Sequence, residues 1–462
     1  MTTTTTTTMP PTGPRGLPLV GPLFDFARDP AGFVARVQRE HGDLASFRVL
    51  GTPTFLVSHP EHIQRVLVEL HGDETKDQIT RGLIRILGQG LLTSEGQVWK
   101  RQRKLAAPSF SRADVAVYAR AMAERAAALA EEVRAPAVRD VHADMTAVTL
   151  DVVVRTLFAR DIAHGDIGET VGATLASYRK AYIGPQRMLP EWFPTRSRRV
   201  FQRGVKRIDE VLSGVIRDAR AHGQRGSDLL SRLLAATDTD GSGMTDQQLR
   251  DEIITLFLAG HETTAIALTS ALYLLGLPDH RAIAERARAE VDAVLGGRAG
   301  GADDVPKLTL IDAIVRETMR LYPPAWIVGR EPVRAIELGG VTIPSGAQVL
   351  ISQWVVHRDA RWFPAPEEFR PDRWLDGSTA ELHRYAYFPF GGGPRVCIGN
   401  HFAMLEAVLI LATLLQRLEV EAVPETRFEL APAVTLRPTG PVMMRVSPRT
   451  QAISARAARS AP

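Results

Sequence analysis

The residue best suited to chemistry is Cys397, the single cysteine in a chain of 462 residues. Gly391, Gly392 and Gly393 precede it, followed by Arg395, and an amphipathic helix pattern begins at Ile398. The glycines allow the backbone to pass close to a large or flat group. The positive end of the helix and the guanidinium favour the thiolate form of the cysteine. Such a thiolate is a metal ligand or a nucleophile, and the alternative is an inert cysteine packed as a small hydrophobic residue.

A second polar motif, Ala259–Thr264, interrupts an otherwise apolar helical stretch. The glycine in its middle costs about 1 kcal/mol relative to alanine, and threonine can bond back to a helix carbonyl and bend the helix. We therefore expect a kink or a widened groove there, with room for a small ligand. His261-Glu262 begins the zinc protease pattern H-E-x-x-H, but position 265 is alanine, which excludes that site.

The pattern around the cysteine, Phe390-x-x-Gly393-x-Arg395-x-Cys397-x-Gly399, resembles the haem-binding signature of the cytochrome P450 family. The resemblance implies a mainly α fold with small β-sheets. It also implies haem b (heme b; iron protoporphyrin IX), buried between the long central helix and the helix after Cys397. Cys397 would be the proximal iron ligand, a thiolate that favours O–O cleavage. Phe390 would pack near the sulfur, Arg395 would reach a haem propionate, and Gly399 would complete the cofactor-binding set.

The central motif A-G-x-E-T-T is similar to the oxygen-activating helix of the same family. The resemblance implies that Thr263 hydrogen-bonds dioxygen and that Glu262 relays protons through water, which is general acid catalysis. It also implies that Trp99 and Arg103, spaced W-x-x-x-R, contact the haem propionates together with Arg330.

Glu317 and Arg320 lie three residues apart on one expected helix and so share a face. With Arg373 they resemble a Glu-x-x-Arg plus Arg network that the family uses to lock the core around the haem pocket. We assign these three residues to the scaffold rather than to catalysis.

The expected elements form one continuous globule, without a long linker or an internal repeat. A hairpin is expected within 42–58, a β-meander over 333–355 and an irregular segment over 357–397. The expected helices are 113–134, 141–159, 199–221, Thr245–Leu277, 280–295, 309–321 and Ile398–Arg417. Residues 1–16 are predicted to be disordered, 17–448 to form a single haem-thiolate monooxygenase domain, and 449–462 to be a flexible basic tail.

The composition excludes several functions and locations. The net charge of +4 is too small for a nucleic-acid-binding protein. The first residues lack the charged and apolar regions of a signal peptide, and the apolar run Ala265–Leu277 is too short to span a bilayer. A single cysteine forms no internal disulfide, which fits a reducing compartment. We expect a cytoplasmic monomer without a membrane anchor.

The resemblance implies a monooxygenase that inserts one atom of O2 into a hydrophobic small molecule. The residues expected to line the substrate pocket are nearly all apolar. They are Ile86, Leu87, Phe257, Ala259, Trp326 and Ile327. Similarity is greatest to a bacterial branch of terpene oxygenases and fatty-acid hydroxylases. Known fatty-acid hydroxylases of that branch anchor the carboxylate with Arg and Tyr in the first hairpin, and Gly51–Leu56 carries neither. The sequence therefore favours a terpenoid substrate over a fatty acid.

No dinucleotide or flavin fingerprint follows Cys397, so electrons are expected from a separate ferredoxin or flavodoxin with its NAD(P)H reductase. Lys100, Arg101 and Lys104 would steer an acidic partner to the proximal surface. Two alternatives remain at this point. One is an enzyme that uses peroxide or rearranges its substrate, and the other is a non-catalytic haem sensor or carrier.

Overall fold

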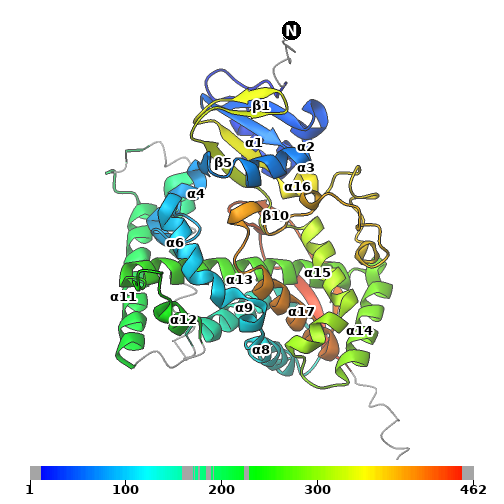
Figure 1. Ribbon diagram of the computed structural model, residues 1–462. Helices are drawn as coiled ribbons and strands as arrows, with labels where there is room; N and C mark the ends of the chain where they lie inside the picture. Colours follow the sequence, from blue (N-terminus) through cyan, green and yellow to red (C-terminus); the bar gives the residue numbers. More distant parts are fainter. Residues whose placement is uncertain are drawn as a thin grey trace, which may run out of the picture.

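The computed structural model describes residues 12–158, 170, 172–174, 177–183, 189, 190, 192–222 and 228–449. Helices dominate, and a five-stranded sheet lies at the end of the molecule that carries the N-terminus (Figure 1). The prediction of a mainly α fold with small β-sheets is confirmed. The longer helices are α2 (Pro30–His41), α6 (Gly96–Ala106), α8 (Ala119–Glu132), α9 (Val141–Phe158), α11 (Arg196–His222), α13 (Asp246–Gly276), α14 (Arg281–Leu295), α15 (Thr309–Leu321) and α17 (Asn400–Arg417). The shorter ones are α1 (Leu23–Arg28), α3 (Pro60–Gln64), α4 (Gln78–Gly82), α5 (Ile84–Leu87), α7 (Arg112–Ala116), α12 (Leu229–Ala235) and α16 (Gln353–Val356).

Helix α13 forms the centre of the fold. At its start the Thr245 hydroxyl accepts the Gln248 N–H at 3.2 Å, and the Gln248 side chain accepts the Thr245 N–H at 3.0 Å. This reciprocal cap satisfies two donors that the first turn would leave unpaired. The helix ends at Gly276, two residues before Pro278, and it continues through Gly260. The predicted helix Thr245–Leu277 is therefore confirmed, with its two terminal residues acting as caps.

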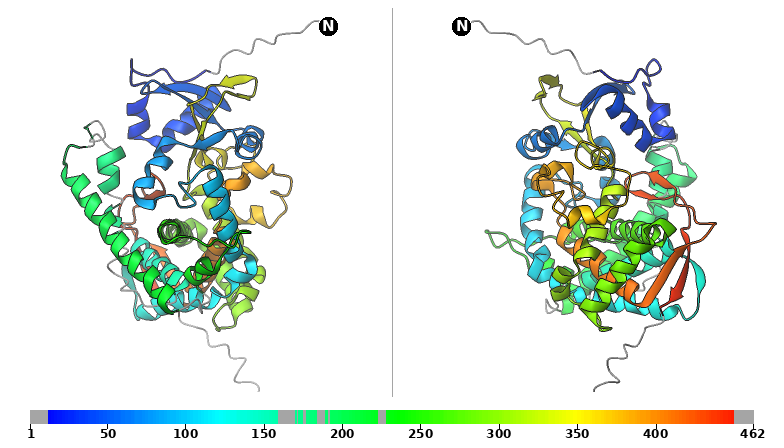
Figure 2. Two further views of the ribbon diagram at one scale, coloured as in Figure 1. Left: turned by 60° about the vertical axis from the view of Figure 1, so that its left-hand side comes forward. Right: turned by 90° about the vertical axis from the view of Figure 1, so that its right-hand side faces the viewer.

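The core of the molecule is built around α13. This helix contacts α9, α11, α15 and α17, and the two views of Figure 2 show helices surrounding it. Among the described residues it is also the one helix long and apolar enough to cross a membrane. However, 61% of its apolar 18-residue window is buried inside the protein. Its apolar character is that of a core helix.

The first hairpin pairs β1 (Leu44–Val49) with β2 (Thr52–Val57) in antiparallel register. The turn residues Leu50 and Gly51 both have positive φ, 50° and 80°. Two consecutive positive φ values give the turn whose twist matches that of the strands. The hairpin predicted within 42–58 is confirmed, with its turn one residue earlier than the glycine and proline signals indicated.

The expected meander over 333–355 is wrong. Strands β6 (Ile336–Leu338) and β7 (Val341–Ile343) form a hairpin of their own, whereas β8 (Gln348–Ile351) runs parallel to β2. The order of the five-stranded sheet is β1-β2-β8-β5-β3, with β5 (Val328–Pro332) and β3 (Glu74–Lys76) completing it. One neighbour of β8 is the nearby β5, but the other, β2, lies about 300 residues earlier in the chain, and local alternation of residue types does not reveal such a pairing.

Two further β units involve the C-terminal part of the chain. β4 (Ala137–Asp140), β12 (Met443–Pro448) and β9 (Leu418–Ala422) form a sheet in the order β4-β12-β9. β10 (Leu430–Pro432) and β11 (Leu436–Pro438) form a separate hairpin, whose tip approaches α13. Strand β4 lies in a segment for which the sequence predicted no strand.

Some element boundaries differ from the predictions. The helix expected over 113–134 is two helices, α7 and α8, separated at Val117 and Tyr118. Helix α11 begins at Arg196 rather than at residue 199, and α17 begins at Asn400 rather than at Ile398. Residue 159, the predicted end of α9, lies outside the described residues.

The predicted domain ends also differ slightly from the structure. The Thr12 carbonyl accepts the Ser46 N–H at 3.1 Å, so an ordered contact already lies inside the segment 1–16. At the other end, the Arg449 guanidinium is paired with Asp292. Residues 1–11 and 450–462, which make up most of the predicted tails, lie outside the described residues.

Candidate active site

The loop before α17 fixes the backbone of Cys397. The Cys397 N–H donates to the Phe390 carbonyl at 2.9 Å, which closes the loop on itself. Gly391 and Gly393 have φ of 72° and 63°, a region that side chains strain. A Cβ at Gly393 would also collide with the Leu67 carbonyl. Gly391 and Gly393 therefore let the loop turn sharply, and Gly393 lies against the Leu67 backbone; the predicted approach of the glycines to a large or flat group stays a prediction.

The Cys397 thiol lies deep in the protein, and burial is the main cause of its raised pKa. The Gly399 N–H and the Arg103 guanidinium act in the opposite direction and lower this pKa. Even so, part of the surface of this residue is not covered by protein. The cation beside the thiol is Arg103, not Arg395 as the sequence suggested.

An uncovered surface also lies on α13, the helix that packs against α17. Ala259 is exposed although Phe257, two residues earlier, is buried. Thr263 lies one turn further along, and its Oγ1 donates to the Ala259 carbonyl at 2.8 Å. Ala259 lies on α13 and Cys397 lies just before α17, and these two helices pack against each other inside the fold. Their uncovered surfaces fit a flat group held between Ala259 and Cys397.

Cationic side chains gather beside this place. The Arg395 guanidinium stacks on the Trp99 ring at 4.0 Å, donates to the Ser94 carbonyl at 2.9 Å and pairs with Glu95. This stacking places Trp99 and Arg395 in one cluster, although 296 positions separate them in the sequence. The pKa of Arg395 is lowered to about 10, mainly by burial and also by the Arg330 and Arg103 cations, while Glu95 and Glu74 act in the opposite direction.

Arg330 reaches the same cluster from β5. Its Nε donates to Glu74 Oε1 at 2.8 Å, and both side chains are almost fully buried. The pKa of Glu74 is raised to about 7, mainly by burial. The sequence analysis missed Lys76, whose pKa is lowered to about 7 by burial and by Arg330 and Arg395.

The charges of this cluster fit the two propionates of haem b. Within the described part of the chain, neither the Lys76 ammonium nor the Arg103 guanidinium has a hydrogen bond or an ion pair. Both residues are half-buried, and burial lowers the pKa of each. An anionic group bound there would offset this cost of desolvation. The residues present therefore fit haem b, with Cys397 as the one thiolate ligand. Arg103, Arg330, Arg395 and Lys76 would surround its propionates.

Glu262 and Thr263 face different surroundings. The Thr435 hydroxyl donates to Glu262 Oε1 at 3.1 Å, and Arg437 lies 3.8 Å from the same oxygen. Both partners belong to the β10–β11 hairpin and its turn. Glu262 is partly exposed on this side, whereas Thr263 lies on the side of Ala259.

The predicted scaffold residues form a fully buried cluster. Glu317 accepts bonds from Arg320 Nε and Nη2 at 2.9 and 2.8 Å and from Arg373 Nε at 3.0 Å. The Trp374 indole N–H at 2.9 Å and the Arg370 N–H at 3.0 Å also donate to it. These bonds join α15 to the irregular segment that leads to the cysteine loop.

The six residues expected to line the substrate pocket belong to different packed clusters, and their role in a pocket stays a prediction. Ile86, Leu87 and Phe257 belong to one buried cluster, which includes α5, α11 and α13. Trp326 and Ile327 belong to another cluster, beside α2 and the first hairpin, where the Trp326 indole donates to the Ala433 carbonyl at 3.0 Å. Ala259 is the one exposed member of the six.

The sequence analysis missed two carboxylates of α13 that hold the loop after α5. Asp251 Oδ2 accepts the Gln89 N–H at 2.7 Å, and Glu252 Oε2 accepts the Leu91 N–H at 3.1 Å. Burial raises the pKa of Glu252 to about 8. The sequence signal that could have identified them is a pair of adjacent acidic residues near the start of an apolar helix. Asp251 and Glu252 fix the loop that runs from Leu87 to Glu95.

A third missed carboxylate is Glu406, on α17 nine residues after Cys397. It is fully buried, and burial raises its pKa to about 8 although the nearby Thr264 hydroxyl lowers it. Thr264 is the second threonine of the central motif. The buried contact therefore links the helix after the cysteine to α13.

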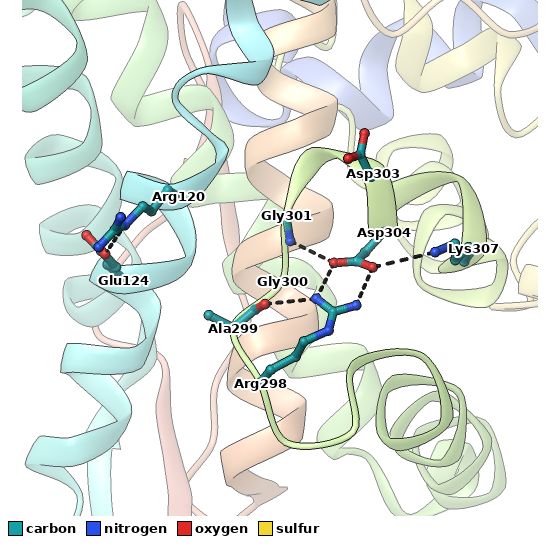
Figure 3. A pocket seen from close by; sticks show the side chains of 9 residues that line it. All are labelled: Arg120, Glu124, Arg298, Ala299, Gly300, Gly301, Asp303, Asp304 and Lys307. Atoms are coloured by element: carbon teal, nitrogen blue, oxygen red, sulfur yellow. Dashed lines mark hydrogen bonds and ion pairs between the residues drawn. The ribbon is translucent and has the colours of Figure 1, made fainter.

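A hollow of about 680 Å³ lies elsewhere, between α8 and the loop after α14 (Figure 3). Most of its charged side chains pair with one another, since Arg298 donates to Asp304 through two bonds of 2.6 Å and Arg120 donates to Glu124 at 2.6 Å. None of the predicted site residues lines it.

The basic residues of α6 that were expected to meet a redox partner are partly neutralised. Arg101 and Lys104 both pair with Asp238, at 3.5 and 2.8 Å. Lys100 is exposed and has no ion pair among the described residues.

Comparison with known proteins identifies similar sequences along nearly the whole chain. A family model described as cytochrome P450 matches residues 11–446. The cyclooctatin synthase of Streptomyces melanosporofaciens is 40% identical over 444 residues, which cover 94% of this chain and 95% of that protein. The cyclooctat-9-en-7-ol 5-monooxygenase of the same organism is 33% identical, with 90% of each chain covered. The pentalenene oxygenase of Streptomyces avermitilis is 31% identical, with 95% of this chain and 97% of that protein covered.

Proposed function

Because the chain belongs to the cytochrome P450 family, it is a haem-thiolate monooxygenase with haem b as its cofactor, and we propose that its substrate is a terpenoid. One observation carries the catalytic part of the proposal. It is the uncovered surface of Cys397, whose thiol lies deep in the fold beside Arg103, a guanidinium with no ion pair among the described residues. The substrate class is supported by the three relatives, which are terpene-modifying enzymes.

When bound, the haem supplies the activation of O2 with two electrons and the insertion of one oxygen atom into the substrate. The protein's own part begins at Cys397, where the Gly399 N–H and Arg103 stabilise negative charge on the sulfur. Lys76, Arg103, Arg330 and Arg395 would orient the cofactor through its propionates. Two of these four cations already have a carboxylate partner, Arg330 with Glu74 and Arg395 with Glu95.

Thr263 Oγ1 is the proposed proton donor on the substrate side. Its hydroxyl now donates to the Ala259 carbonyl, and rotation about χ1 would redirect this proton towards the reacting oxygen. Glu262, partly exposed beside Thr435, would restore the proton through water, because a carboxyl near the surface exchanges with solvent. These roles of Thr263 and Glu262 belong to the proposal.

We also propose where the electrons come from and where the enzyme works. A separate ferredoxin or flavodoxin with its NAD(P)H reductase would dock beside α6, where Lys100 is exposed and Arg103 lies near the thiol. The protein would act in the cytoplasm as a monomer. Pull-down with an acidic ferredoxin should weaken in Lys100→Glu.

An optical titration of the ferric haem protein tests the substrate class. Terpene hydrocarbons and alcohols, fatty acids and steroids are added separately, and the Soret shift towards high spin reports displacement of water from the iron. A saturable shift with terpenes, followed by one labelled atom in the product under isotopic dioxygen, is the expected result. A shift with fatty acids alone would indicate that the substrate is a fatty acid and that the reaction is hydroxylation of its chain. Turnover without an electron donor would replace the monooxygenase by a peroxide-driven enzyme.

A further inference from the structure

An exposed aromatic turn precedes α11. Trp192 is 80% exposed, Phe193 44% and Leu189 38%. The rings of Trp192 and Phe193 lie 6.2 Å apart, edge to face. Of the six tryptophans in the chain, Trp192 is the exposed one, since the other five are buried or half-buried.

A buried arginine holds this turn in place. The Arg198 guanidinium donates to the carbonyls of Leu189 at 2.9 Å and Phe193 at 3.0 Å, and also to that of Pro190. Arg198 is 3% exposed. One buried side chain thus satisfies three carbonyls on the inner side of the turn. The apolar side chains of the turn remain on its outer side.

The first three turns of α11 carry a stripe of positive charge, which we call the α11 stripe. At 100° per residue its members fall within an arc of about 100°. They are Arg196, Arg199, Arg203, Lys206 and Arg207. Arg196, Arg199, Arg203 and Lys206 have no ion pair with any residue that the structure describes.

The opposite face of α11 is apolar and packs on the core. Phe201, Ile208, Leu212 and Ile216 are each at most 5% exposed and belong to the cluster around Phe257. In Figure 1 the helix runs along the outer left edge of the molecule. The α11 stripe therefore faces outward, next to the aromatic turn.

We propose that the aromatic turn and the α11 stripe together bind the surface of an anionic lipid bilayer. Cations on one face attract acidic headgroups, while tryptophan and phenylalanine enter the boundary between headgroups and acyl chains. An acidic protein would pair with the stripe alone, and the outward aromatic pair is what favours a bilayer. Such reversible contact would bring the enzyme to the phase in which apolar molecules collect.

Vesicle binding by the full-length haem protein tests this inference. Vesicles of phosphatidylglycerol and of phosphatidylcholine are compared by flotation at low salt and at 0.5 M salt. We expect binding to phosphatidylglycerol, little binding to phosphatidylcholine, and loss of binding at high salt. Bilayer contact also predicts that brominated phosphatidylglycerol quenches part of the tryptophan emission, and that this part is missing in Trp192→Phe.

The charge is tested with two matched triple variants. Arg196→Gln/Arg199→Gln/Arg203→Gln should weaken binding about 100-fold, at about fivefold for each cation. Arg134→Gln/Arg384→Gln/Arg427→Gln removes the same charge from exposed positions elsewhere and should bind like the wild type. Equal loss in the two triples would overturn the site, as would unchanged quenching in Trp192→Phe. Binding to polyglutamate without binding to phosphatidylglycerol vesicles would overturn the bilayer proposal and indicate that the partner is an acidic protein.

Discussion

Replacing Glu317 with glutamine should destabilise the protein far more than removing a half-exposed carboxylate from the same helix. Glu317 is 0% exposed and lies between Arg320 and Arg373, which are 0% and 1% exposed at their side chains. Glutamine keeps the shape of the side chain but removes the negative charge. Two buried guanidinium groups would then face each other without a counter-ion.

The size of the effect follows from this burial. Breaking a buried ion pair by removing one partner costs about 3–5 kcal/mol, because the remaining charge stays desolvated. The unfolding entropy of about 2.1 cal/mol/K per residue gives about 1 kcal/mol/K for 462 residues. The melting temperature of Glu317→Gln should therefore fall by about 3–5 °C.

The assay is thermal unfolding of the haem-loaded protein, followed by calorimetry at one scan rate. Asp312→Asn is the matched control, since Asp312 pairs with Arg316 on the same helix but the two side chains are 29% and 45% exposed. Such a pair contributes less than about 1 kcal/mol, so the control should shift by no more than about 1 °C. Equal shifts in the two variants would refute the assignment of Glu317 as a buried scaffold carboxylate.

Three further outcomes are expected. Thr263→Ala should uncouple electron-donor consumption from product formation. The control is Thr264→Val, which should stay coupled, because the Thr264 hydroxyl bonds the Gly260 carbonyl. Oxygen, donor and product are measured together, and equal coupling in the two variants would show that Thr263 is not part of the proton relay. Burial raises the pKa of Glu406 from 4.5 to about 8, so the folded state holds a proton that the unfolded state has lost between these pH values, and stability falls as pH rises through this window. Glu406→Gln should make the profile of melting temperature against pH flatter from pH 5 to 8, and an unchanged profile would show that Glu406 is ionised in the fold. Arg103→Met should speed haem transfer to an apomyoglobin acceptor by about tenfold or more, because a charged hydrogen bond contributes about 1.5–3 kcal/mol. Lys104→Met is the control. Equal transfer rates in the two variants would show that Arg103 does not bind the propionates.

Motifs with strict local geometry were predicted well. The helix predicted over Thr245–Leu277 matches α13, and two of the glycines before Cys397, Gly391 and Gly393, take positive φ values. These features depend on interactions within a few residues, which a single sequence displays directly.

Features that depend on distant partners were not predicted. Lys76 joins the cation cluster because β3 pairs with β5, which lies about 250 positions later in the chain. Arg395 turned out to stack on Trp99 and pair with Glu95, which leaves Arg103 as the cation beside the thiol. Trp326 packs beside the first hairpin rather than with Phe257. In each case the contact is made by tertiary packing, and no local pattern announces it.

We propose that Cys397 supplies the thiolate that makes this fold a monooxygenase. This role is tested by the absorption spectrum of the reduced, CO-treated protein, recorded for the wild type and for Cys397→His after haem loading. We expect the red-shifted Soret band of thiolate ligation in the wild type. We expect that band to be lost in Cys397→His, with haem still bound. A wild-type spectrum without the red-shifted band, or a variant that keeps it, would show that Cys397 is not the iron ligand.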